Sequence, residues 1–73
     1  MYQIQNDKDT HNFTTFDALI SYLEYNNQKD TCSIIIPWSS TEPIVKMFQK
    51  IEELVYTVMN IEHTDQGLVI QLL

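Results

Sequence analysis

Three consecutive isoleucines at residues 34–36 constrain the fold more than any other feature of the chain. They belong to the segment 32–37, which reads Cys-Ser-Ile-Ile-Ile-Pro. β-branched side chains favour strands, and successive residues of a strand point to opposite faces of its sheet. A strand that is apolar on both faces is usually central in its sheet. We therefore expect the chain to build a sheet around residues 32–37.

The first part of the chain contains two more recognisable elements. Apolar and amide side chains alternate over residues 2–5, which predicts a short half-buried strand. Residues 6–12 are polar throughout and are expected to form a connection. Apolar residues then recur with helical spacing, which predicts a helix over about residues 15–26. Thr14 and Asp17 have the spacing of a capping box at its start.

A second amphipathic stripe follows the central strand and predicts a helix that ends near Leu54. Ser39 and Glu42 again have capping-box spacing, and Pro43 is tolerated in the first turn of a helix. These features place the helix start directly after a loop that begins with Trp38.

The last part of the chain is expected to form a hairpin. Residues 56–63 and 68–73 are rich in β-branched and apolar residues, which favours two strands. Residues 64–67 form the turn between them, with Gly67 in a left-handed conformation. Residues 55–60 also fit a continuation of the preceding helix, so both interpretations stand at this stage.

This order of elements predicts a single α+β domain over residues 1–73, with the arrangement β-α-β-α-β-β. Strands joined by a helix should run parallel, and the hairpin places the last strand antiparallel to the third. We expect a two-layer sandwich with a mixed four-stranded sheet in the order 1-2-4-3. Both helices should cover one face and leave the other face open.

Composition excludes several classes of function. The chain has 73 residues, ten acidic side chains, four lysines and no arginine, so its net charge is −6. This charge disfavours binding to nucleic acids and to anionic membranes. His11 and His63 show no metal-binding spacing, and no motif for a catalytic group, cofactor or small-molecule ligand is present. One cysteine, without a signal peptide or a membrane span, predicts a cytoplasmic protein.

The open sheet face is the first candidate contact surface. Ile35, Val69 and Leu73 are expected to form an apolar patch there, and exposed apolar patches often mark interfaces. Trp38 is a possible anchor because tryptophan is enriched at binding hot spots. A loop tryptophan also commonly folds onto the core, so both roles remain open. These residues predict a non-catalytic interaction or regulatory module that forms a homodimer or binds a protein partner.

The thiol of Cys32 supports an alternative hypothesis, a small thiol or sulfur carrier. In element order the chain resembles the sulfur-carrier proteins of tRNA thiolation, which place a Cys-Pro-x-Pro loop before a helix. The corresponding segment 37–43 reads Pro-Trp-Ser-Ser-Thr-Glu-Pro and has no cysteine. Cys32 instead lies in the central strand, where a free cysteine usually acts as a small buried apolar residue. A further alternative is an acidic decoy of a nucleic-acid-binding partner, although the acidic residues are scattered along the sequence.

Overall fold

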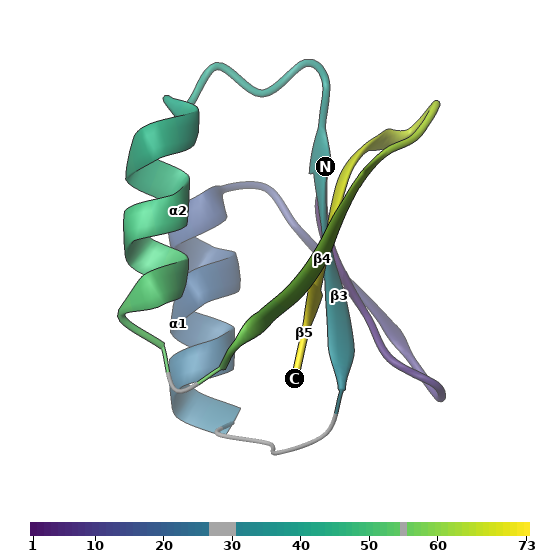
Figure 1. Ribbon diagram of the computed structural model, residues 1–73, viewed down its shortest axis with the longest axis vertical. Coiled ribbons are helices and arrows are strands. Elements are labelled where there is room, and N and C mark those ends of the chain that lie inside the picture. Colours follow the sequence, from purple (N-terminus) through teal and green to yellow (C-terminus); the bar gives the residue numbers. More distant parts are fainter. Residues whose placement is uncertain (27–30, 55) are drawn as a thin grey trace.

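The computed structural model describes residues 1–26, 31–54 and 56–73. A twisted sheet forms one layer, and two helices pack side by side on one of its faces (Figure 1). Along the chain the elements are β1 (Tyr2–Gln5), β2 (Thr10–Phe13), α1 (Phe16–Asn26), β3 (Cys32–Pro37), α2 (Ile44–Glu52), β4 (Val58–His63) and β5 (Gly67–Leu72).

The sheet has five strands in the order β2-β1-β3-β5-β4, and every neighbouring pair is antiparallel. The predicted α+β class is confirmed, but the predicted mixed sheet of four strands is wrong. The additional strand β2 reverses the chain before α1, so β1 meets β3 in the antiparallel sense. The four expected strands lie in the expected relative order within this larger sheet. The additional strand β2 also changes the order of elements, on which the likeness to sulfur carriers rested.

Residues 6–12 do not form the simple connection that their polarity predicts. Asn6 begins a tight turn, in which its Oδ1 accepts hydrogen bonds from the backbone N–H groups of Lys8 and Asp9 at 2.9 and 2.7 Å. The chain then returns as β2, whose Phe13 packs beside Tyr22 of α1 with ring centroids 5.4 Å apart. Because β2 is short and mostly polar, only its antiparallel pairing with β1 reveals it as a strand.

The core lies between the helices and the sheet. Its fully buried side chains come from the sheet and from both helices: Ile4, Phe16, Leu19, Ile34, Met47, Ile51, Ile70 and Leu72. Each contributes roughly 1.5–3 kcal/mol by leaving water. Lys50 of α2 forms an ion pair with Asp17 of α1, which links the exposed sides of the two helices.

The helix starts differ from the expected capping boxes. Thr15, rather than Thr14, caps α1, because its Oγ1 accepts a hydrogen bond from the Ala18 N–H at 3.2 Å. At α2 the cap residue is Pro43, which makes no side-chain cap bond. The predicted box of Ser39 with Glu42 is therefore wrong.

The boundaries near the end of α2 also shift. The helix ends at Glu52, about two residues before the predicted end. β4 begins at Val58, about two residues later than predicted, so residues 58–60 belong to a strand. Tyr56 and Thr57 precede this strand and do not extend the helix. Val55 lies outside the described residues. The predicted turn at 64–67 is present, and Gly67 has a φ of +151° at the start of β5.

Candidate functional site

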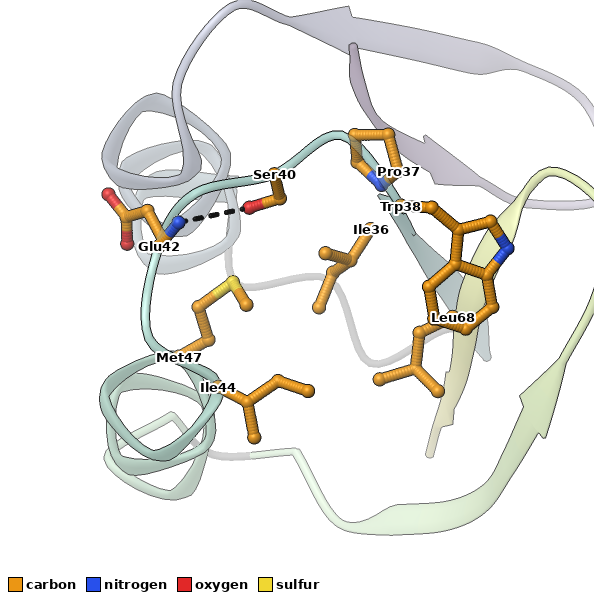
Figure 2. Close-up of a pocket in the computed structure, with 8 residues that line it drawn as sticks. All are labelled: Ile36, Pro37, Trp38, Ser40, Glu42, Ile44, Met47 and Leu68. Carbon is orange, nitrogen blue, oxygen red and sulfur yellow. Dashed lines mark hydrogen bonds between the residues drawn. The ribbon is translucent and has the colours of Figure 1, made fainter.

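A pocket of about 230 Å³ opens where the end of β3, the start of α2 and the start of β5 meet (Figure 2). We call it the Trp38 pocket. Its lining is mostly apolar and consists of Ile36, Pro37, Trp38, Ser40, Glu42, Ile44, Met47 and Leu68.

The position of α2 creates this pocket. Ile44 and Met47 are three residues apart, so they share the helix face that turns toward the sheet. Met47 is buried in the core, whereas Ile44, one turn nearer the helix start, is 52% exposed. Figure 2 shows Ile44 and Leu68 pointing toward each other across the space between α2 and the sheet. The first turn of α2 therefore leaves part of its apolar stripe uncovered.

Trp38 forms the wall opposite α2 and is 53% exposed. Its indole Nε1 donates a hydrogen bond to the backbone oxygen of Thr64 at 2.8 Å. The indole also stacks on the imidazole of His63, at the end of β4. Trp38 thus contacts the β4–β5 hairpin and lies outside the core cluster, so half of this large side chain stays accessible at the pocket.

Ser40 and Glu42 supply the polar part of the lining. The Ser40 hydroxyl forms a hydrogen bond of 2.6 Å with the hydroxyl of Tyr2. Ser40 Oγ also accepts a hydrogen bond from the backbone N–H of Glu42 at 3.3 Å. The carboxylate of Glu42 points away from the pocket (Figure 2). The interior that a ligand would meet is therefore predominantly hydrocarbon.

The open sheet face carries the other residues that the sequence singles out. Ile35 and Val69 are direct cross-strand partners. Ile35 is only 6% exposed although it lies outside the core cluster, and Val69 is partly buried. Leu73 is 57% exposed, but Gln71 lies between it and Val69 on the same face of the strand. The structure therefore brings two of the three residues together, and it places Trp38 at a separate pocket.

Cys32 lies within the core cluster, with its side chain buried. Burial raises the pKa of the Cys32 thiol above its ordinary value, because the charged thiolate is poorly solvated there. A thiolate nucleophile needs the opposite shift.

The described residues contain no group of three His, Cys, Asp or Glu side chains that could hold a metal ion. Nε2 of His11 pairs with the hydroxyl of Tyr22 at 3.2 Å, and His63 contacts Trp38. Neither helix of the described structure is long and apolar enough to cross a membrane.

Sequence reasoning did not identify Ile36, Ile44, Met47 or Leu68 as site residues. Their apolar character and helical or strand spacing pointed only to a core. The one available clue was an apolar stripe that begins at Ile44, close in sequence to a loop tryptophan. Comparison of the chain with protein-family models, curated proteins and solved structures found no match.

Proposed function

We propose that the chain is a small, non-catalytic protein-binding module whose main contact surface is the Trp38 pocket. The supporting observation is that Trp38 and Ile44, two large side chains, remain about half exposed on opposite sides of one apolar pocket. Apolar surface of this kind often marks an interaction site, and tryptophan is enriched among binding hot spots.

The lining of the Trp38 pocket favours binding over catalysis. Nucleophilic catalysis needs a nucleophile beside a base. The candidate nucleophile in the lining is Ser40, whose hydroxyl is already paired with Tyr2 and with the Glu42 backbone. The Glu42 carboxylate points away from the pocket.

We also propose a cytoplasmic location, since the lone Cys32 suits a reducing compartment.

A site-specific crosslinking experiment tests the proposal. A photo-crosslinking amino acid would replace Ile44 in one variant and Gln49 in a matched control. Both variants would be expressed in cells of the organism that encodes the protein. Gln49 is exposed on the same helix, about 140° around the axis from Ile44. We expect protein adducts from position 44 and not from position 49. Absence of adducts at position 44, or the same adducts at both positions, would contradict the proposal.

A homodimer through the open sheet face is a second candidate. Two apolar side chains on this face favour it, because Leu73 is exposed and Val69 is only partly buried. Light scattering over a dilution series tests it. Leu73→Lys is the better probe than Ile35→Lys, because a lysine at the buried position 35 would also destabilise the fold. We expect Leu73→Lys, but not the control Gln49→Lys, to lower the solution mass. A monomer at every wild-type concentration would exclude this candidate.

Two further hypotheses receive less support. A thiol carrier using Cys32 would need an accessible thiolate, whereas this thiol is buried and its pKa is raised. An acidic decoy would need its carboxylates aligned on one face. Asp9 lies at the β1–β2 turn, Asp17 on α1 and Asp65 in the β4–β5 turn, so these three acids belong to different parts of the fold.

A further inference from the structure

We propose that the Trp38 pocket binds one large apolar side chain of a partner peptide, and that lysine or arginine residues flank this side chain in the peptide. The inference rests on the proposed function. Three properties of the pocket favour such a partner: its volume, the chemistry of its walls and the distribution of charge around it.

The volume favours a single side chain over a free ligand. Pockets for small molecules usually measure about 300–1,000 Å³. The Trp38 pocket, at about 230 Å³, lies below that range. Interface anchors are individual side chains that fill small, well-desolvated pockets. A protruding leucine, isoleucine, methionine or phenylalanine meets this description.

The walls favour an apolar anchor. Ile36, Ile44, Met47 and Leu68 contribute hydrocarbon from three different elements. Met47 also allows some adjustment of shape, because its unbranched thioether side chain adopts many conformations. The hydroxyl of Ser40 is already hydrogen-bonded, so a polar anchor would lose its water without gaining a new partner there.

The charges near the pocket favour basic residues beside the anchor. Glu42 lies at one side, with its carboxylate pointing away from the apolar interior, and Asp65 follows Thr64, whose backbone accepts the indole hydrogen bond at the other side. None of the lysines that the structure describes lines the pocket. Lys46 is about 200° around α2 from Ile44, on the far side of the helix.

The remaining charge of the molecule acts in the same direction. Lys50 pairs with Asp17 on α1, and the whole chain carries a net charge of −6. A negative surface attracts and orients a basic segment. The exposed part of the Trp38 indole offers a lysine or arginine a cation–π contact as well.

Synthetic peptides of defined sequence test this inference. Four capped probes would carry Leu, Ile, Met or Phe between two lysines on each side. Matched controls would replace the central residue with Ser or the lysines with Glu. Trp38 is the sole tryptophan of the chain, so its fluorescence reports binding at the pocket directly.

We expect at least one apolar, lysine-flanked peptide to titrate the Trp38 emission. The Ser-centred and Glu-flanked controls should bind at least about tenfold more weakly. Raising the salt from about 50 to about 500 mM should weaken the lysine-flanked complex, because salt screens the attraction of exposed charges. Ile44→Ser should also reduce affinity about tenfold or more, whereas Gln49→Ser should not. Circular dichroism would establish that both variants are folded.

The outcomes separate this inference from the proposed function. If none of the four lysine-flanked peptides binds, or if the Glu-flanked controls bind equally well, the inference is wrong. Equal binding by wild type and Ile44→Ser would also overturn it. Crosslinking at position 44 can still succeed in each of these cases, and the protein-binding proposal would then stand with a partner of different chemistry. Failure of both experiments would exclude both.

Discussion

The indole of Trp38 stacks on the imidazole of His63, with ring centroids 5.6 Å apart and an angle of 20° between the ring planes. The two residues lie 25 positions apart in the sequence, one directly after β3 and the other at the end of β4. This contact and the indole hydrogen bond to Thr64 hold one wall of the Trp38 pocket in place. A wall fixed before a partner arrives reduces the entropy lost on binding.

Substitutions of Trp38 should therefore lower stability in two steps. Trp38→Phe keeps an aromatic ring but loses the Nε1 hydrogen bond, and we expect the free energy of unfolding to fall by about 0.5–1.5 kcal/mol. Trp38→Ala also loses the stack on His63, which should cost about 0.5–1.5 kcal/mol more. Urea unfolding followed by circular dichroism measures both. Ser39→Ala, at the exposed neighbouring position, is the control. Unchanged stability in Trp38→Ala would show that the contact does not hold the loop.

The two adjacent threonines before α1 provide a second prediction. Thr15→Ala removes the hydroxyl that caps the Ala18 N–H, and it should lower the free energy of unfolding by about 1 kcal/mol. Thr14→Ala alters an exposed side chain outside this cap and should change it by less than about 0.5 kcal/mol. Thermal or urea unfolding of the pair gives a direct comparison. A larger loss of stability in Thr14→Ala than in Thr15→Ala would instead support the capping box of Thr14 and Asp17 that the sequence predicts.

The predictions from sequence succeed where the pattern is local. The run of isoleucines in β3 and the apolar stripe of α2 are each visible within about ten residues. The sequence does not predict β2, because its polar residues resemble a loop and its pairing depends on β1. The predicted cap of α1 differs from the observed one by a single residue, because two threonines are adjacent in the sequence.

The candidate site was harder to predict for a related reason. Its walls come from β3, α2 and β5, and Trp38 is held by His63 and Thr64 from a distant part of the chain. The sequence pattern of an apolar helix stripe does not show which of its residues the sheet covers and which stay exposed. The difference between buried Met47 and exposed Ile44 exists only in the assembled fold.

Gly67 is the position where the backbone itself should resist substitution. Its φ of +151° is rarely adopted by residues with a side chain, and an added Cβ would lie 2.1 Å from the backbone oxygen of Ile36. We expect Gly67→Ala to destabilise the protein by at least about 1–3 kcal/mol. Gln66→Ala, at an exposed position in the same turn, should have little effect. Similar midpoints of urea unfolding for the two variants would show that the hairpin tolerates the added methyl group.

Because the thiol of Cys32 is buried, the free energy of unfolding should depend on pH in the alkaline range. Burial raises its pKa in the folded protein, so above the ordinary thiol pKa the unfolded chain loses this proton more readily than the folded chain does. The resulting contribution to stability is complete below the ordinary pKa and is lost as the pH rises through the folded value. The thiol can lower the free energy of unfolding by at most about 1.4 kcal/mol for each unit of rising pH.

Urea unfolding of wild type and Cys32→Ala between neutral and alkaline pH isolates this effect, because all other titrating groups are shared. We expect the stability of the wild type to fall more steeply with pH than that of the variant. A thiol-specific reagent should also react much more slowly with the native protein than with the urea-unfolded chain, since the side chain is only 7% exposed. Equal reaction rates in the two states would show that the thiol is accessible, and the sulfur-carrier hypothesis would then regain support.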